Sequence, residues 1–262
     1  MTILDELADY ARFRVAESKK NISLDELKDR ALSLKKGEFT FENALKKPDI
    51  SFICECKKAS PSKGVIAENF PYLEIAKAYD DAGADAISVL TEPKWFLGSD
   101  DYLKDIAANV CIPCIRKDFT VDEYMIYEAK LLGASAVLLI CSITNAKDLE
   151  AHLRVCDDLG LSALVEAHDE EEIKTAINVG ARVIGVNNRN LKDFSVDTNN
   201  SRRLRELVPS DVVFVSESGV KSADDINNLR NAGVNAVLVG ETLMRAKDKS
   251  RKLKELKGEI ND

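Results

Sequence analysis

The sequence lacks long apolar runs and has no excess of basic residues. No stretch approaches the roughly 20 apolar residues of a membrane-spanning helix, and the acidic segment MTILDELADYARFRV (1–15) lacks the apolar core of a signal peptide. The net charge is -8 and the isoelectric point about 5.1, which argues against nucleic-acid binding through a broad basic surface. These absences predict a cytoplasmic protein with no membrane or nucleic-acid partner, but they allow a local basic pocket for a small anion.

The sequence is also poor in residues that build metal and redox centres. It has two histidines, and its one C-x-x-C pair (111–114) has no second copy. Of these histidines, His168 begins a loop and is expected to be exposed to solvent rather than to act as a base. Without a Ser/His/Asp pattern or a dinucleotide fingerprint, we predict no metal site and no cofactor. Buried, reduced thiols are expected at all six cysteines: Cys54, Cys56, Cys111, Cys114, Cys141 and Cys156.

A recurring segment organises the rest of the chain. Each copy ends a helical pattern, turns at a glycine and enters a short apolar strand: 82–90, 132–140, 179–187 and 232–240. The copies start 50, 47 and 53 residues apart, which suits two strand–helix units per interval. Four more strand candidates alternate with these copies: 51–58, 111–119, 161–168 and 212–219. Eight strands alternating with helices are typical of a (β/α)8 TIM barrel, which belongs to the α/β class.

Helical patterns follow most of these strands, with apolar residues three or four positions apart. They cover residues 72–83, 120–133, 146–160, 169–180, 199–208 and 222–233, and a charged final helix is predicted over 246–262. No linker rich in Gly, Pro or Ser divides the chain, so we predict a single barrel domain over 1–262. Residues 1–48 form a helical N-terminal extension, which can either cover the barrel floor or lend side chains to the active face.

Chemistry in such a barrel takes place where strands end and the following loops begin, and the first strand ends in two charged residues. Alternation places Ile53, Glu55 and Lys57 on one face and Cys54 and Cys56 on the other. If the cysteines pack under helices, the carboxylate and the ammonium point into the barrel mouth. Charges there are costly unless they are paired or used, so a structural ion pair and a functional pair both fit.

The third and fifth strands also end in charged residues. Lys117 shares its face with Ile115, and Glu166 shares its face with Leu164, so both charges are predicted to point inward. A lysine among apolar strands can act as a general acid or bind an anion. A carboxylate facing it across the mouth completes an acid/base arrangement, with a purely structural salt bridge as the alternative.

The last three strand ends favour a phosphorylated substrate. Asn187 can orient a substrate hydroxyl or carboxylate, and Arg189 can bind an anion. Gly219 and Gly240 follow the seventh and eighth strands, where barrels commonly bind phosphate through backbone N–H groups. The neighbouring Glu241 argues against an anion at this place unless its side chain points elsewhere.

Seven motifs, in this order, resemble those of the indole-3-glycerol-phosphate synthase family of tryptophan biosynthesis. They are ECKKASPSKG (55–64), FLGS (96–99), RKDF (116–119), LVEAH (164–168), GVNNRNL (185–191), SESG (216–219) and VGETLM (239–244). The first and third are specific, whereas the glycine motifs occur in many barrels. The resemblance spans essentially the whole chain. It implies a lyase that closes the indole ring of 1-(2-carboxyphenylamino)-1-deoxyribulose 5-phosphate with loss of carbon dioxide and water.

The resemblance also implies catalytic roles. Lys117 would protonate the ribulose carbonyl, and Glu166 would act as acid/base during ring closure and dehydration. Lys57 would hold the anthranilate carboxylate and can donate the proton for dehydration. Glu55 would position Lys57 and Asn187, and Asn187 would orient polar groups.

The remaining implied site residues bind the substrate. Ser218, which the resemblance places with the catalytic residues, would form a hydrogen bond at the barrel mouth. The anthranilate pocket would be lined by Ser60, Phe119 and Leu139. The phosphate side would include Arg189, Gly219, Gly240 and Glu241.

Two other functions fit the same fold. An isomerase similar to phosphoribosylanthranilate isomerase would share the barrel and the phosphate site. It would not explain Glu55, Lys57 and Lys117 together with the S-P-S loop. A non-catalytic sugar-phosphate binding protein would bind the substrate without releasing carbon dioxide. In each case we expect a monomer that binds a small phosphorylated molecule.

Overall fold

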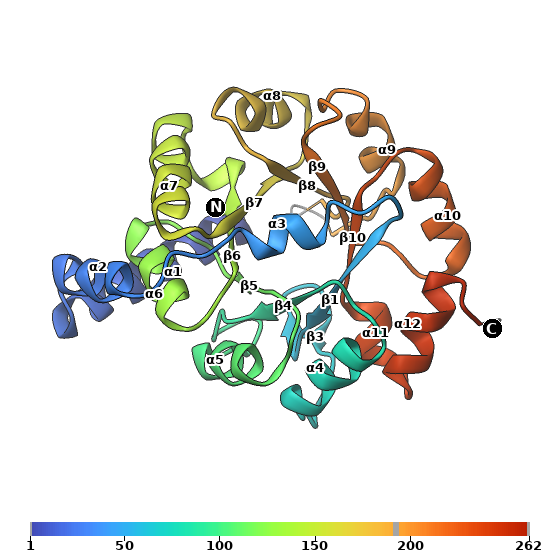
Figure 1. Cartoon of the computed structure of the whole chain (residues 1–262), viewed down its shortest axis with the longest axis horizontal. Coiled ribbons are helices and arrows are strands. Elements are labelled where there is room, and N and C mark those ends of the chain that lie inside the picture. The colour runs from blue at the N-terminus through green and yellow to red at the C-terminus, as the bar shows by residue number, and fades with distance from the viewer. Residues whose placement is uncertain (1, 191–193, 261–262) are drawn as a thin grey trace.

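The computed structural model describes residues 2–190 and 194–260, and its core is a closed barrel of eight parallel strands (Figure 1). Going round the barrel, the strands pair in sequence order and the last one closes on the first. They are β1 (Ser51–Cys56), β4 (Ala86–Leu90), β5 (Cys114–Lys117), β6 (Ala136–Ile140), β7 (Ser162–Ala167), β8 (Val183–Asn187), β9 (Val213–Glu217) and β10 (Ala236–Val239). Each predicted strand segment supplies one of them, so the predicted barrel is confirmed.

Helices follow the strands and surround the barrel. The outer helices are α4 (Tyr72–Asp81), α5 (Asp100–Asn109), α6 (Glu123–Leu131), α7 (Ala146–Leu159), α8 (Glu170–Asn178), α9 (Asn199–Arg205), α10 (Ala223–Asn231), α11 (Glu241–Arg245) and α12 (Lys249–Lys257). A 3-10 turn, η1 (Cys141–Ile143), follows β6. Of these, α5 was not predicted. Residues 261–262 of the predicted final helix and Leu191 of the GVNNRNL motif lie outside the described residues.

Side-chain capping explains where several outer helices begin. The side chains of Ser99, Asp122, Asn145, Asp169 and Ser222 each accept a backbone N–H from the first turn of the helix that follows. These bonds satisfy donors that have no partner within the helix. The helices therefore start at fixed places, and the loops between strand ends and helices are short.

Strand alternation produces two separate apolar cores. Inward-facing side chains such as Ile53, Ile115 and Leu164 form the barrel interior. Outward-facing side chains such as Cys54 and Val165 pack under the surrounding helices. The predicted division of the first strand, with the cysteines outside, is therefore confirmed. Charged residues at inward positions of the strand ends must face the mouth of the barrel.

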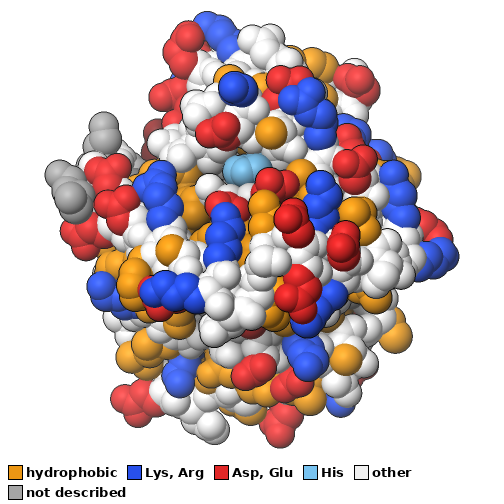
Figure 2. All heavy atoms as spheres, turned by 90° about the vertical axis from the view of Figure 1, so that its left-hand side faces the viewer, with side chains coloured by type: hydrophobic (Ala, Val, Ile, Leu, Met, Phe, Trp, Pro, Cys, Tyr) orange, Lys and Arg blue, Asp and Glu red, His pale blue; other side chains and the backbone are white. Residues whose placement is uncertain are grey.

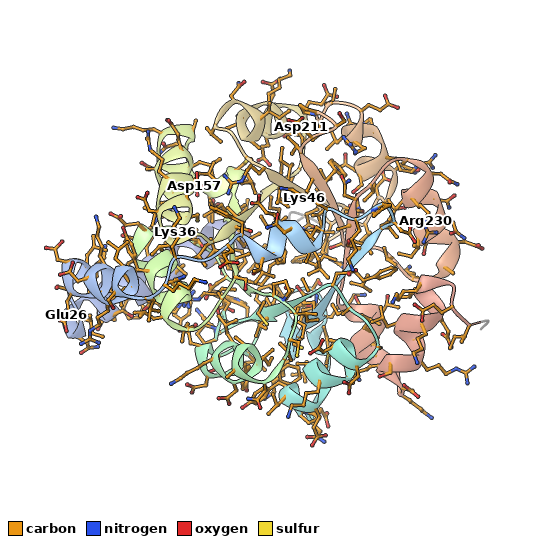
Figure 3. The ribbon with its side chains drawn as sticks, viewed as in Figure 1. Glu26, Lys36, Lys46, Asp157, Asp211 and Arg230 are labelled. Atoms are coloured by element: carbon orange, nitrogen blue, oxygen red, sulfur yellow. The ribbon has the colours of Figure 1, made fainter. Side chains whose placement is uncertain are left out.

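The N-terminal extension occupies both ends of the barrel. It contains α1 (Ile3–Asn21), α2 (Leu24–Ser33) and α3 (Thr40–Ala44). Figure 1 shows α3 lying across the barrel, where Phe41 and Leu45 are fully buried in the interior core. Beside α3, Lys46 lies 3.2 Å from the buried carboxylate of Glu42 (Figure 3). In contrast, α1 contributes Leu7 to the cavity at the strand ends.

The loop after β1 forms a small hairpin rather than an irregular turn. Strands β2 (Ala59–Ser60) and β3 (Gly64–Val65) pair antiparallel. Gly64 has a φ of +62°, a conformation that glycine adopts without steric cost. The hairpin presents the S-P-S segment at the rim of the cavity.

The cysteine prediction is partly wrong. All six thiols are free, and Cys54, Cys56, Cys114 and Cys156 are buried. However, Cys111 is exposed and Cys141 is only half-buried. Cys111 precedes β5, whose pairing begins at Cys114, so it lies outside the packed part of the strand.

The surface carries intermixed charges. The face at the left of Figure 1 shows lysine and arginine side chains interspersed with aspartate and glutamate, without a broad basic area (Figure 2). Within residues 2–190 and 194–260, no helix is long and apolar enough to cross a membrane.

Candidate active site

A cavity of about 730 Å³ lies at the carboxyl ends of the barrel strands. All but one of the predicted site residues line it: Glu55, Lys57, Ser60, Lys117, Phe119, Glu166, Asn187, Arg189, Ser218, Gly219, Gly240 and Glu241. They come from every strand end except those of β4 and β6, far apart in the sequence, and barrel closure brings them together. This is the face where barrel enzymes carry out their chemistry.

The exception is Leu139, which is a correction. It packs in the outer core under the helices, whereas its neighbours Leu138 and Ile140 line the cavity. The reason is strand register: Leu138 pairs with the inward-facing Leu164 of β7, so the inward positions of β6 are the even-numbered ones. A shift of one residue moves a side chain to the opposite face.

Glu55 and Lys57, at the end of β1, form a close ion pair inside the cavity. The Lys57 Nζ lies 2.5 Å from Glu55 Oε2, and the Ser88 hydroxyl donates to Glu55 Oε1 at 3.4 Å. Gly240 lies against this pair: a Cβ at that position would stand 2.3 Å from Glu55 Oε2 and 2.9 Å from Lys57 Nζ. A glycine is required there because the pair fills the space that a side chain would take.

Lys117, at the end of β5, lies between two buried carboxylates. Its Nζ is 3.4 Å from Glu166 Oε2 and 3.4 Å from Glu217 Oε2. Burial alone would lower the pKa of Lys117, but the charges of Glu217 and Glu166 outweigh burial and raise it. The ammonium form is therefore strongly favoured at neutral pH.

The two carboxylates share Lys117 but differ in acidity because their other neighbours differ. Burial would raise the pKa of Glu166, but Lys117 and His168 lower it. Burial and the charges of Glu166 and Glu55 together raise the pKa of Glu217 to about 7, against the opposing effect of Lys117. Glu166 is thus the ionised partner, and Glu217 can gain or lose a proton near neutral pH.

Glu217 is a site residue that the sequence interpretation missed. It lies one position before Ser218, in the same SESG motif. Val213 and Val215 of β9 belong to the interior core, and Glu217 continues their face. Strand alternation, applied to β9 as it was to β1, would have predicted an inward carboxylate.

His168 is also more involved than predicted. It is not fully exposed: its side chain has a relative accessibility of 21%, and its Nε2 lies 3.4 Å from Glu166 Oε1. Its Nδ1 lies 3.2 Å from Glu172 Oε2. The predicted position of His168 at the start of a loop is correct, but its ring points back toward the strand ends.

Polar groups at the ends of β8 and β9 are joined through Asn187. The Ser218 hydroxyl and the Arg189 backbone N–H both donate to Asn187 Oδ1 at 3.0 Å. The Asn187 amide in turn donates to Glu166 Oε1 at 3.5 Å. These bonds give the asparagine a defined orientation. Gly219, which follows Ser218, has a φ of +99°, a backbone conformation that favours glycine.

Glu241 is neutralised by surrounding cations. Its carboxylate lies 3.0 Å from Arg245, 3.7 Å from Lys63 and 3.7 Å from Arg189. Burial would raise the pKa of Glu241, but Arg245 and Lys63 lower it. The rim beside Gly219 and Gly240 therefore has more positive than negative charge, which removes the objection to an anion there.

One wall of the cavity is apolar. The rings of Phe96 and Phe119 lie 6.0 Å apart, centroid to centroid, and Leu7, Leu138 and Ile140 lie on the same cavity. A flat aromatic group can be buried between such side chains. The cavity thus has an aromatic-binding wall and a cationic rim, with two charged clusters between them.

Within the described part of the chain, no group of three or more His, Cys, Asp or Glu side chains is arranged to hold a metal ion.

Comparison with known proteins identifies the family. The profile of the family described as indole-3-glycerol phosphate synthase matches residues 4–256. The chain belongs to this family. Its resemblance in sequence motifs, its barrel fold and the extent of the match all agree, and as a member of the family it is a carboxy-lyase. Neither the isomerase nor the non-catalytic alternative is favoured.

Individual relatives extend over nearly the whole chain. The protein named indole-3-glycerol phosphate synthase in Ruminiclostridium cellulolyticum is 58% identical, with 98% of this chain and 99% of the relative covered. That in Endomicrobium trichonymphae is 52% identical, covering 97% and 99%. Among solved structures, thiamine phosphate pyrophosphorylase from Pyrococcus furiosus has a TM-score of 0.61 at 17% identity, covering 83% of this chain and 96% of that one. At this identity the similarity shows the shared fold alone.

Proposed function

We propose that this cavity binds 1-(2-carboxyphenylamino)-1-deoxyribulose 5-phosphate and that its lysines and carboxylates catalyse indole ring closure. The observation that carries the proposal is Lys117, buried between Glu166 and Glu217 in a cavity that also holds the Glu55–Lys57 pair. Attack of a ring carbon on a carbonyl needs an acid aimed at the developing alkoxide. The product is indole-3-glycerol phosphate, formed with loss of carbon dioxide and water.

Lys117 is the general acid of ring closure. Because its carboxylate neighbours raise its pKa, it carries the proton needed by the ribulose carbonyl oxygen. Glu166 is the acid/base group of ring closure and dehydration, since its lowered pKa leaves it ionised and able to accept a proton. Asn187 orients it through the amide hydrogen bond.

Lys57 holds the anthranilate carboxylate until it leaves as carbon dioxide. Glu55 positions the Lys57 ammonium at 2.5 Å and is its ion-pair partner between turnovers. Lys57 is also placed to donate the proton that converts the leaving hydroxyl to water. Loss of the substrate carboxylate during the reaction leaves Lys57 with Glu55 as its partner.

Binding groups on the rim and the wall fix the substrate. Ser60 and Phe119 line the anthranilate pocket, with Leu138 in place of Leu139. Ser218 hydrogen-bonds at the mouth, and Arg189, Gly219 and Gly240 bind the phosphate. Binding energy from the phosphate, remote from the reacting carbons, can then orient the reacting groups.

No cofactor is needed for these steps, and we propose that the protein acts in the cytoplasm as a monomer without a nucleic-acid partner. The intermixed charges on the face shown in Figure 2 support the absence of a nucleic-acid partner. Size-exclusion chromatography with light scattering tests the monomer, for which the mass of one chain, 29.0 kDa, is expected.

Lys117→Ala tests the proposed general acid. We expect kcat to fall by at least about 10²-fold, while the dissociation constant for the substrate changes little because the phosphate side is intact. Indole fluorescence growth measures turnover, and titration calorimetry measures binding. Lys104→Ala, an exposed position on α5, is the control and should retain full turnover.

Normal turnover of Lys117→Ala would refute the assignment. If the unsubstituted chain binds the substrate without indole growth, the sugar-phosphate binding function is favoured instead.

A further inference from the structure

The ring of His168 is held between two carboxylates. Its Nε2 lies 3.4 Å from Glu166 Oε1, and its Nδ1 lies 3.2 Å from Glu172 Oε2 on α8. The Ser142 hydroxyl lies 3.4 Å from Nδ1. The Nε2 atom is buried and forms no hydrogen bond, so the nearby Glu166 carboxylate acts on it through its charge.

The backbone of His168 is anchored on both sides. Its N–H donates to Glu172 Oε2 at 2.8 Å, and its carbonyl accepts from Asn200 Nδ2 on α9 at 3.1 Å. The residue immediately follows β7, which carries Glu166. The ring therefore has a fixed position relative to the catalytic carboxylate.

The two contacts determine the charge of the ring. A neutral imidazole has one N–H and one lone pair, so either tautomer would direct a lone pair at a carboxylate oxygen. The imidazolium carries an N–H on each nitrogen, and its positive charge lies 3.4 Å from Glu166 Oε1 and 3.2 Å from Glu172 Oε2. The other ionisable group acting on the ring is Glu217 on β9, also a carboxylate, while Lys117 lies on the far oxygen of Glu166. Burial would lower the pKa of His168, but these carboxylates raise it to about 9.

We infer that His168 is a positioning residue of the reaction, which acts through Glu166: as an imidazolium it keeps this carboxylate ionised through the catalytic cycle. Glu166 has a cation at each oxygen: Lys117 at Oε2 and His168 at Oε1. When Lys117 gives its proton to the substrate it becomes neutral, and one of the two cations is lost. His168 does not touch the cavity and retains its charge, so Glu166 keeps a partner at that moment. The inference rests on the proposed role of Glu166.

Nuclear magnetic resonance tests the charge of His168 without reference to activity. The chain has two histidines, so ¹⁵N-histidine labelling gives two sets of ring signals, and His152→Gln identifies those of His168. We expect both ring nitrogens of His168 to be protonated at pH 7, with a titration midpoint near 9. His152 should be neutral at pH 7, because burial lowers its pKa. A neutral His168 ring at pH 7 would overturn the inference.

Kinetics test whether this charge acts through Glu166. His168→Gln removes the charge, so the pKa of Glu166 should rise and the acid limb of the pH–rate profile should move to higher pH. At a fixed pH on that limb, kcat/KM should fall about tenfold, mainly through kcat. His168→Lys keeps a positive charge and should return the limb toward its original position. His152→Gln, the same replacement away from the cavity, should leave the profile unchanged.

The outcomes separate this inference from the proposed function. Equal impairment of His168→Gln and His168→Lys with an unmoved acid limb means a purely structural histidine and overturns the inference. Glu166→Gln tests the carboxylate itself: retained turnover removes the catalytic role of Glu166. The resonance experiment still reports the charge of His168 in that case.

Discussion

The charged residues of this site lie within a few ångströms of one another. Alternation along each strand largely predicts which of them face inward. Glu55, Lys57, Lys117 and Glu166 lie where their strands place them, at inward positions of β1, β5 and β7. The family resemblance implied Leu139 on β6, but its neighbour Leu138 takes the inward position. On β9, the same alternation that places Val213 and Val215 inward also places Glu217 inward.

Gly240→Ala tests the close approach at the end of β10. The new methyl carbon would stand 2.3 Å from Glu55 Oε2, so the Glu55–Lys57 pair must move. We expect kcat/KM to fall roughly 10²-fold, the effect typical of a displacement of about 1 Å in a catalytic group. Steady-state kinetics measure this change.

The matched control is Gly180→Ala. Nothing lies within 4 Å of the added carbon there, but φ is +83°. This substitution should lower the free energy of unfolding by about 1 kcal/mol with unchanged kcat/KM. Wild-type kinetics for Gly240→Ala would show that the ion pair tolerates displacement.

At the level of elements, the N-terminal extension is attached to the catalytic face by a buried ion pair. Arg14 of α1 donates to both oxygens of Asp118, at 2.6 and 3.0 Å. Asp118 follows Lys117 directly and also accepts from the Thr91 hydroxyl at 2.7 Å. Burial would raise the pKa of Asp118, but Arg14, Arg116 and the Thr91 hydroxyl together lower it. α1 thus supports the loop that carries the general acid.

Arg14→Leu should therefore destabilise the fold. The Asp118 side chain is fully buried, and removing one partner of a buried ion pair leaves an uncompensated charge. We expect the free energy of unfolding to fall by about 3 kcal/mol, as measured by urea denaturation. Arg12→Leu is the control on the same helix. Its pair with Asp9 is exposed, and such pairs contribute little. Equal effects of the two substitutions would contradict a supporting role for the Arg14–Asp118 pair.

For the whole molecule, buried ionisable groups predict how stability depends on pH. The pKa of His168 is raised from 6.5 to about 9, so its contribution is fully present below pH 6.5 and is lost as pH rises toward 9. Glu217, raised from 4.5 to about 7, has the same sign: its contribution is present below pH 4.5 and is lost as pH rises through 7. Asp118 has a lowered pKa, and its contribution is lost as pH falls through the folded value, below the ordinary 3.8.

The free energy of unfolding should therefore decrease between pH 6.5 and 9. The expected decrease due to His168 is about 2 kcal/mol, less than the full shift implies because the side chain is partly exposed. Denaturation at a series of pH values measures it, and His168→Gln should remove this part of the slope. His152→Gln should not, because a lowered pKa affects stability only below about pH 6.5. A flat wild-type profile would contradict the raised pKa of His168.

Local sequence patterns were sufficient for the barrel and for the charged strand ends that line the cavity. The reason is that hydrophobic periodicity and side-chain alternation depend on neighbours along the chain. The family motifs indicated the reaction. Neither the patterns nor the motifs predicted which end of the barrel α1 and α3 cover, because the apolar face of an amphipathic helix does not specify the surface against which it packs.

Only closure of the barrel brings together Lys117 from β5, Glu166 from β7 and Glu217 from β9. Their pKa values follow from that proximity and from burial, which are properties of the folded molecule and not of any segment. The same holds for His168, whose sequence position indicates a loop start. Its two carboxylate contacts come from packing α8 against the end of β7.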